Sequence, residues 1–223
     1  MQFPSDPLYS DCVRILKKKV KQPAAQDAFC RWLEATFGTG RIILVKNDLT
    51  PHDQRSRLWI ICERQEDADS FMKASEGFYG RDPEKEARIL AKAEEEGLLE
   101  HRDNPPGLGP FIALAAFEPV AQQEALGEIK QAQLDDLAGK FQRKRVWLIR
   151  RSLSGFLVMF QSEADRLAAE VDGTSNDITR RLTDLARRYD KLGYFRNALA
   201  QVRFGSKEVF DRDYAGNWFN YER

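Results

Sequence analysis

The segments WLEATFGTGRIILVK (residues 32–46) and DLAGKFQRKRVWLIR (residues 136–150) follow one pattern. Each segment contains a phenylalanine, then an arginine, then an apolar run: Phe37 and Arg41 in the first segment, Phe141 and Arg145 in the second. The two phenylalanines are as far apart along the chain as the two arginines. Similarity at a fixed spacing is the sign of an internal repeat. The pattern therefore predicts a related structural unit in each half of the chain.

A second apolar run follows in each half, LWIICERQED from residue 58 and FLVMFQSEAD from residue 156. Runs of β-branched and aromatic residues predict strands, and the amphipathic segments around them predict helices. We expect an α+β fold of two tandem, duplicated α-β-β-α-α-β modules. Each would have a small antiparallel sheet with helices on one face, ferredoxin-like in character. The alternative to duplication is chance coincidence, because few identical residues support the match.

The stretch HRDNPPGLGP (residues 101–110) contains three prolines and two glycines. Proline fixes φ and removes a backbone donor, and glycine favours turns, so we expect no regular structure there. We therefore predict a linker at residues 104–110. It would separate an N-terminal module at residues 1–103 from a C-terminal module at residues 111–223 that ends in an aromatic tail.

The composition is that of a folded globular chain with balanced charge. Hydrophobic residues make up 42% and charged residues 31% of the chain, and 35 basic side chains oppose 35 acidic ones. Balanced charge gives no overall field toward nucleic acid or an anionic membrane. The chain has neither a signal-peptide pattern at its start nor an apolar run near the roughly 20 residues of a membrane helix. Three cysteines without CxxC spacing indicate buried thiols, so we expect a cytoplasmic protein without a cofactor.

The last residues of the chain are rich in aromatic side chains. Chain ends ordinarily fray, so such a tail either docks on its own domain, the default expectation, or binds a partner. Because Tyr, Trp and Arg dominate protein interfaces, the lead hypothesis is a non-catalytic binding protein, an inhibitor or regulator of the immunity type with a protein partner. The predicted contact residues are four from the tail and two from the basic helix before it: Tyr214, Trp218, Phe219, Tyr221, Arg180 and Arg187.

The basic run at residues 140–151 supports an alternative, a tandem RNA-binding protein. The run interleaves with Trp147 and leads into the apolar segment GFLVMF, in the manner of a sheet whose aromatic residues stack on bases. Only part of the RNP1 order is present, and both faces of the strand at residues 156–160 are apolar, which predicts a buried strand. The residues predicted to contact nucleic acid are the basic ones around this hairpin: Arg143, Lys144, Arg145, Arg150 and Arg151.

Acidic residues support a third hypothesis, a carboxylate-dependent hydrolase. Asp48, His52 and Asp53 lie in one loop, and Asp211 and Asp213 form a D-x-D pair near the C-terminus. Paired carboxylates can perform acid–base chemistry, and a D-x-D pair can hold Mg²⁺. Charged residues in loops and on helix surfaces are more often simply solvated. The sequence therefore assigns no catalytic residue and no metal ligand, and it does not favour an enzyme.

Overall fold

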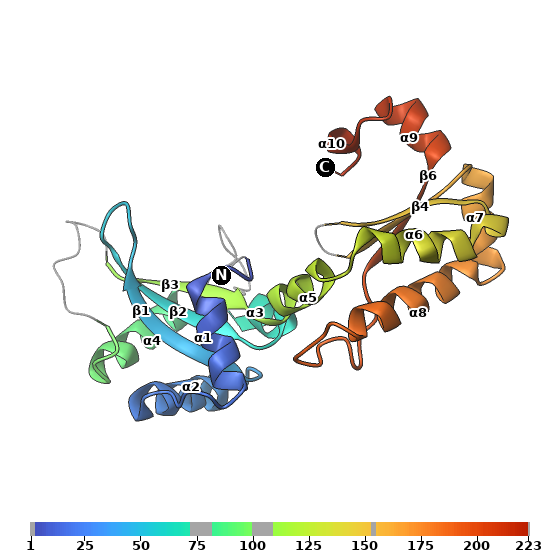
Figure 1. Ribbon diagram of the computed structural model, residues 1–223. Coiled ribbons are helices and arrows are strands. Elements are labelled where there is room, and N and C mark those ends of the chain that lie inside the picture. The colour runs from blue at the N-terminus through green and yellow to red at the C-terminus, as the bar shows by residue number, and fades with distance from the viewer. Residues whose placement is uncertain (1–2, 72–81, 100–108, 153–154, 223) are drawn as a thin grey trace. The chain divides into compact units, whose positions relative to one another are not determined.

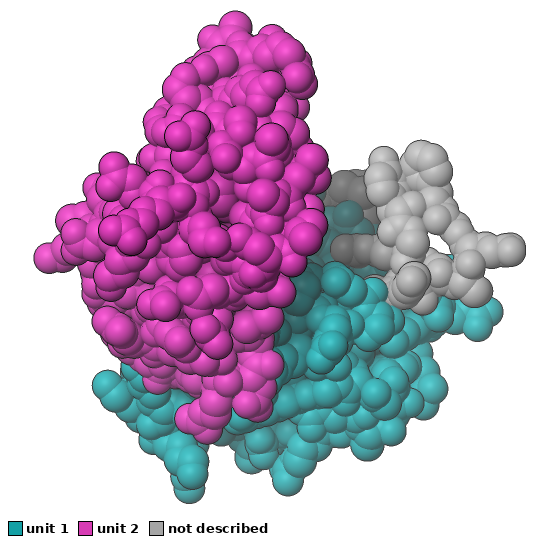
Figure 2. All heavy atoms as spheres, turned by 90° about the vertical axis from the view of Figure 1, so that its right-hand side faces the viewer, with its two compact units in different colours: residues 1–120 teal, residues 121–223 magenta. Residues whose placement is uncertain are grey.

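The computed structural model describes residues 3–71, 82–99, 109–152 and 155–222. These residues form a mixed α+β fold with two small three-stranded sheets (Figure 1). The chain divides into two compact units, unit 1 at residues 1–120 and unit 2 at residues 121–223, which Figure 2 shows in teal and magenta. Each unit contains one sheet, and the predicted α+β class is confirmed.

Unit 1 builds its sheet from three strands that alternate with helices. The helices are α1 (Pro7–Leu16), α2 (Ala24–Phe37), α3 (Gln65–Phe71) and α4 (Pro83–Glu95). The strands are β1 (Ile42–Leu49), β2 (Ser56–Cys62) and β3 (Phe111–Ala116), in the order β1-β2-β3. β1 and β2 pair antiparallel, and β2 and β3 pair parallel. The path from β2 to β3 runs through α3 and α4, because parallel strands need a crossover connection.

Local signals in the sequence set the ends of these helices. Asp6 and Asp82 cap α1 and α4, because their carboxylates accept backbone N–H groups of the first turn, and a proline follows each cap. Gly38 ends α2 in the left-handed conformation, with φ of 62°. Residue types at the caps therefore account for these three helix ends.

The main core of unit 1 lies between one face of the sheet and the helices α2 and α4. Leu58, Ile60 and Ile112 on the strands cluster with Leu33 on α2 and Ile89 on α4, and all five are fully buried. Burying such side chains stabilises the fold by about 1.5–3 kcal/mol each. This core buries one side of β2, so the alternate side chains of that strand project from the other face of the sheet.

Unit 2 repeats the arrangement and adds two helices at its end. Its helices are α5 (Glu118–Gly127), which contains the boundary between the units, α6 (Gln131–Lys140), the 3₁₀ turn η2 (Gln142–Lys144), α7 (Glu163–Val171), α8 (Thr174–Arg187), α9 (Lys207–Tyr214) and α10 (Trp218–Tyr221). Its strands are β4 (Val146–Arg151), β5 (Phe156–Phe160) and β6 (Val202–Ser206), in the order β4-β5-β6.

Both faces of the second sheet are covered. On one face, Val158 of β5 lies in the core cluster with Leu182 of α8. On the other face, Leu157 and Met159 of β5 pack against Phe210 of α9. Figure 1 shows α9 and α10 on the opposite side of this sheet from α6 and α8. The strand β5 is therefore buried on both faces, as its sequence predicts.

The two sheets have the same topology. In each, the first pair of strands is antiparallel, the second pair is parallel, and the first strand has a register irregularity near its start. The aligned arginines hold equivalent places: the carbonyl oxygen of Arg41 accepts the Glu63 N–H at 2.8 Å, and that of Arg145 accepts the Gln161 N–H at 2.9 Å. The similar segments of the sequence thus occupy similar places in the two units.

One expectation differs from the structure. The sheets are mixed rather than antiparallel, because the third strand of each returns through a helical crossover and pairs parallel. The strand Phe111–Ala116, which follows the predicted linker, is the third strand of the first sheet, as the α-β-β-α-α-β order has it, and the two compact units divide after it. Parallel pairing is a long-range contact that the local sequence pattern does not contain. Of the predicted linker at residues 104–110, residues 104–108 lie outside the described part of the chain.

The structure shows the burial of the three cysteines and the length and polarity of the helices. Cys12, Cys30 and Cys62 are buried free thiols, as predicted, and burial raises the pKa of each to about 12. Among the described residues, no helix combines the length and the apolar character that crossing a membrane requires.

Candidate functional site

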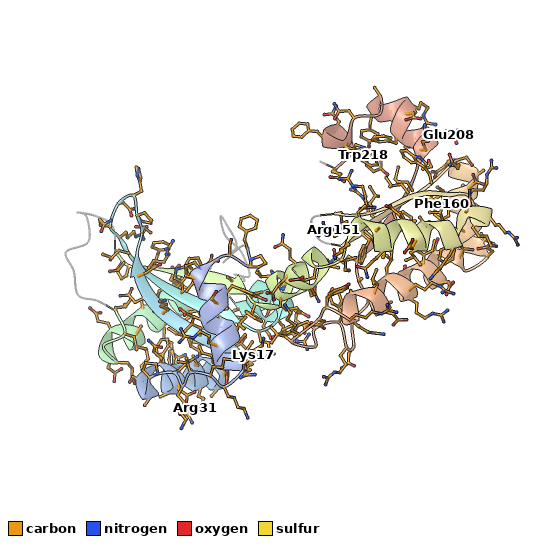
Figure 3. The ribbon with its side chains drawn as sticks, in the orientation of Figure 1. Lys17, Arg31, Arg151, Phe160, Glu208 and Trp218 are labelled. Carbon is orange, nitrogen blue, oxygen red and sulfur yellow. The ribbon has the colours of Figure 1, made fainter. Side chains whose placement is uncertain are left out.

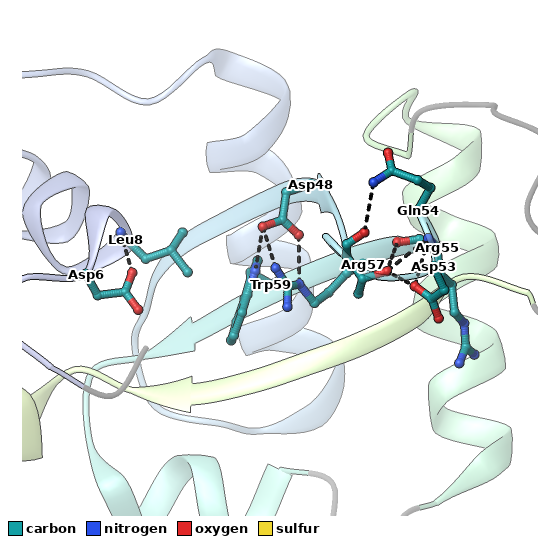
Figure 4. Close-up of polar contacts among 9 residues, drawn as sticks. Asp6, Leu8, Asp48, Asp53, Gln54, Arg55, Arg57 and Trp59 are labelled. Atoms are coloured by element: carbon teal, nitrogen blue, oxygen red, sulfur yellow. Dashed lines mark hydrogen bonds and ion pairs between the residues drawn. The ribbon is translucent and has the colours of Figure 1, made fainter.

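A cluster of polar and aromatic contacts joins β1 and β2 (Figure 4). The Arg57 guanidinium donates to both carboxylate oxygens of Asp48, at 2.8 and 2.7 Å, and the Trp59 indole N–H donates to the same carboxylate at 3.1 Å. The Arg57 Cζ atom lies 4.6 Å from the centre of the Trp59 ring. Asp48 therefore orients a guanidinium and an indole ring that also stack on each other.

The alternation of the strand places this cluster on the face of the sheet opposite the main core. Leu58 and Ile60 belong to that core, and Arg57 and Trp59 alternate with them along β2. Asp48 lies directly across from Arg57 in the antiparallel register. The main core thus buries one side of β2 and presents the arginine and tryptophan on the other.

A second guanidinium lies against an aromatic ring beside this cluster. The Arg55 Cζ atom is 4.5 Å from the centre of the Phe111 ring, and Phe111 is the register partner of Arg57 in the parallel pair. These residues together form what we call the hairpin surface, and each is half-buried: Asp48, Arg55, Arg57, Trp59 and Phe111.

The chemistry of the hairpin surface is that of recognition. The hydrogen bond to Asp48 raises the pKa of Arg57, so the guanidinium is charged at every physiological pH. Tryptophan and arginine supply large contact area and directed donors, and they recur at the energetic centres of protein interfaces. Because Asp48 already holds both groups, little side-chain entropy is lost when a partner binds.

The predicted aromatic tail packs mainly on its own unit. The ring centre of Trp218 lies 4.1 Å from that of Phe210 and 6.2 Å from that of Trp147 on β4. Tyr214 and Tyr221 belong to the same cluster, with ring centres 4.9 Å apart. Among these four tail residues, Phe219 differs, since 65% of it is exposed. The default expectation, docking of the tail on its own domain, describes the other three.

The two arginines predicted to bind a partner have different surroundings. Arg180 is exposed on α8 and forms an ion pair with Asp177. Arg187 donates to the carbonyl oxygen of Phe195 at 2.8 Å and pairs with Asp184 at 2.9 Å. Arg187 thus holds the loop after α8 in place. Among the described contacts, Arg180 makes no such hydrogen bond to a backbone carbonyl.

The structure separates the predicted nucleic-acid residues into two groups. Arg143, Lys144 and Arg145 are exposed in and just after η2. Arg150 and Arg151 lie at the other end of β4, where Arg150 stacks on the Trp218 ring at 4.6 Å and Arg151 donates to α5 carbonyl oxygens at 2.8 and 3.3 Å. The five residues therefore do not form one surface, and the second group contributes to the packing of unit 2.

The sheet of unit 2 does not offer its aromatic residues to bases. Phe156 and Phe160 lie in the main core, and α9 and α10 cover Trp147 on the opposite face. An RNA-recognition sheet stacks bases on exposed rings. Contact with nucleic acid through this sheet face does not fit the observed packing.

The candidate carboxylates do not converge. His52 and Asp53 are exposed in the hairpin loop, Asp48 is committed to Arg57, and each acid of the D-x-D pair has a basic partner on α9: Asp211 with Lys207, and Asp213 with Arg212. The hydrogen bond from Thr50 is the main cause that lowers the pKa of Asp53. Within the described ranges, no three His, Cys, Asp or Glu side chains come together as a metal site would require.

Sequence reasoning missed Arg57, Trp59 and Phe111. The usable signal is the period of two in SRLWIIC, which puts arginine and tryptophan on one face and leucine and isoleucine on the other. The contribution of Phe111 could not be found that way, because it depends on the parallel pairing of β3 with β2.

No protein-family model, no curated protein and no solved structure matches the chain.

Proposed function

We propose that this chain is a non-catalytic binding protein, an inhibitor or regulator of the immunity type, and that it binds a protein partner through the hairpin surface. The observation that carries the proposal is the Arg57–Trp59 pair, which Asp48 holds by hydrogen bonds and which is half-buried on the strand β2. Such a group offers a partner aromatic area and a fixed charge at little entropic cost.

The test is affinity capture from the native host with the full chain as bait. The Trp59→Ala variant is expected to lose most of the retained partner, since an interface tryptophan of this kind is commonly worth 2 kcal/mol or more, roughly a thirtyfold change in Kd. Hydrogen exchange on the captured complex is expected to show protection in residues 55–59.

The matched control is Phe219→Ala, which removes an exposed aromatic side chain from unit 2. The hairpin surface is supported if the Phe219→Ala variant still captures the partner and the Trp59→Ala variant does not, with both variants shown to be folded by circular dichroism. Loss of the partner in the Phe219→Ala variant alone assigns binding to the tail instead. Failure of the wild-type chain to retain any protein removes the lead function.

A second candidate function, binding of RNA, is favoured by a separate basic surface on unit 2. The Arg181 Cζ atom lies 5.6 Å from the Phe141 ring, which brings α8 next to η2. The end of α6, the turn η2 and α8 carry exposed cations here, and we call them the basic ridge: Lys140, Arg143, Lys144, Arg180 and Arg181. Asp172 and Asp177 neutralise part of this charge.

The RNA candidate makes a prediction about salt. Affinity for a fluorescent single-stranded RNA should fall steeply with salt, because each neutralised phosphate adds about −0.7 to the logarithmic slope. Arg143→Glu should weaken binding at low salt more than Lys191→Glu, which changes an exposed lysine of the same unit outside the ridge. Equal effects of the two variants, or binding insensitive to salt, would remove this candidate.

We also propose that the two units are copies of one duplicated module of ferredoxin-like character. The common strand order, the register irregularity in each first strand and the equivalent arginine carbonyls support duplication. The crossover between parallel strands is one component of the split βαβ arrangement. The three buried free thiols support a reducing, cytoplasmic setting. An experimental structure in which the two sheets fail to superpose would refute the duplication.

A further inference from the structure

A cavity of about 760 Å³ opens in unit 1 between the connection from α1 to α2 and the strand β1. Its floor is formed by Cys30, Ile42 and Ile43, whose side chains are almost fully buried and add little surface of their own. Ile15 and Val20 extend the apolar lining on the side of α1. The volume falls in the range of about 300–1,000 Å³ that is typical of small-molecule sites.

The connecting segment is fastened over this floor by one side chain. The Gln22 amide nitrogen donates to the carbonyl oxygen of Ile43 on β1, and the Cys30 Sγ–H lies 3.8 Å from the Gln22 amide oxygen. Because Gln22 bonds to the edge of the sheet, the segment forms a wall of the cavity rather than a loose loop, and Lys18, Val20, Lys21 and Gln22 are the residues that line it.

The rim of the cavity carries basic side chains in excess of acidic ones. Lys18, Lys21, Arg31 and Arg41 line it, against two acids: Asp27 pairs with Arg31 at 3.0 Å, and Glu34 keeps its charge while it accepts the Ile42 N–H at 2.7 Å. The side chains of Lys18 and Lys21 are exposed. The four basic and two acidic side chains leave the lining with an excess of positive charge.

The backbone at Lys18 is unusual for a lysine. The Lys18 N–H donates to the Ile15 carbonyl and the Lys19 N–H to the Arg14 carbonyl, which is the Schellman arrangement at the end of a helix. The position that glycine ordinarily fills in this motif is Lys18, with φ of 54°. A left-handed lysine is strained, and observed strain of this kind often accompanies a functional side chain. Here the strained residue is one that lines the cavity.

We propose that this cavity binds a small organic phosphate, with the phosphate at Lys18 and Lys21 and the apolar or aromatic body of the ligand against Ile15 and Val20. The excess of positive charge in the lining suits an anion, and ammonium groups are common phosphate ligands in proteins. The partly exposed side chains of Ile15 and Val20 suit the remainder of such a molecule. This site is separate from the hairpin surface and does not depend on the proposed protein partner.

The test is calorimetric titration of the full chain with adenosine diphosphate and with naphthyl phosphate, using adenosine as the uncharged comparison. The proposal expects binding of the phosphates and none of adenosine. The double variant Lys18→Ala/Lys21→Ala should weaken binding roughly tenfold or more, which corresponds to the loss of charge-assisted hydrogen bonds. Binding of neither phosphate at about 1 mM, the weakest useful affinity, overturns the proposal.

The matched control is Lys17→Ala/Lys19→Ala, because it removes two charges from the same run at residues that do not line the cavity. Figure 3 labels Lys17 just past the end of α1 and Arg31 on α2. Retained affinity in this control supports a built site. An equal loss in both double variants indicates diffuse attraction and overturns the proposal.

A third variant, Lys18→Gly, separates binding from folding. Glycine fits the left-handed position without strain, so the midpoint of thermal unfolding should rise while affinity for adenosine diphosphate falls. A merely structural lysine would give the higher midpoint with unchanged affinity, and that result contradicts the proposal.

Discussion

At Gly205 the backbone of β6 lies directly beneath the hydroxyl group of Tyr221. A Cβ atom at this position would collide with that hydroxyl and would lie 2.9 Å from the Met159 sulfur. The absence of a side chain at one strand position is therefore what lets the tyrosine reach the sheet. Sequence reasoning could not anticipate this contact, because a glycine in a strand indicates a close approach without naming the group that approaches.

We predict that Gly205→Ala destabilises unit 2 by about 1–3 kcal/mol, the usual cost of overpacking, because Tyr221 must move away from the sheet. Urea unfolding followed by tryptophan fluorescence measures the change. The control is Gly139→Ala in α6, where an added Cβ meets nothing within 4 Å and should stabilise by about 0.5–1 kcal/mol. Equal effects of the two substitutions would show that Tyr221 does not occupy the observed position.

The three thiols lead to a prediction about pH. Burial is the main cause that raises the pKa of Cys12, Cys30 and Cys62 from 9.0 to about 12, so the folded state keeps these protons more firmly than the unfolded state. Their contribution to stability is complete below pH 9 and is lost as the pH rises from about 9 toward 12. The urea midpoint should therefore fall over that alkaline range.

The same thiols should be unreactive in the folded chain. Labelling with a disulfide reagent at pH 8 should be slow in buffer and rapid in denaturant, because the thiolate is the reactive form. The Cys12→Ala variant should retain slow labelling of the remaining two. Rapid labelling of the native wild type would contradict the burial of these side chains.

At the scale of elements, the tail shows how a local pattern can mislead. The density of aromatic residues in DRDYAGNWFNYER correctly indicates an ordered segment, yet it does not say that Trp218 lies against Trp147 and Arg150 of β4. The distinction between docking and partner binding depends on which side chains the helix α10 turns toward the sheet. With only four residues, α10 is too short for its periodicity to decide that.

We predict that Trp218→Ala destabilises unit 2 by roughly 2–3 kcal/mol, less than a fully buried tryptophan because the side chain is half-buried. The neighbouring substitution Phe219→Ala should change stability by less than about 0.5 kcal/mol, as exposed positions usually do. Guanidinium unfolding of the two variants measures the difference. A larger loss in Phe219→Ala would reverse the assigned orientation of α10.

The strands were the most predictable elements of the fold, and the pairing of the strands was its least predictable feature. Apolar runs at β1, β2, β4 and β5 are visible in the sequence because alternation and β-branching are local properties. The place of β3 in the first sheet agrees with the predicted α-β-β-α-α-β order, but the composition of the stretch before it does not show whether that stretch separates two domains. The hairpin surface escaped prediction likewise, since Asp48 meets Arg57 only through the register of two strands.

At the scale of the whole molecule, each unit has its own core. The cluster around Leu58 contains residues of unit 1, and the cluster around Leu182 contains residues of unit 2. A domain with its own hydrophobic core can unfold as its own cooperative block. Two similar sheets within one chain therefore need not share a single folding transition.

We predict that Leu58→Ala and Leu182→Ala, each removing a fully buried leucine, lower the stability of their own unit by about 2–5 kcal/mol and leave the other unit protected. Native-state hydrogen exchange separates the two, because the slow amides of β2 and of β5 report on different cores. Each variant is the control for the other, since the residue type and the burial are the same. If either substitution accelerates exchange in both sheets equally, the two cores form one cooperative block, and a repeat whose copies fold independently is excluded.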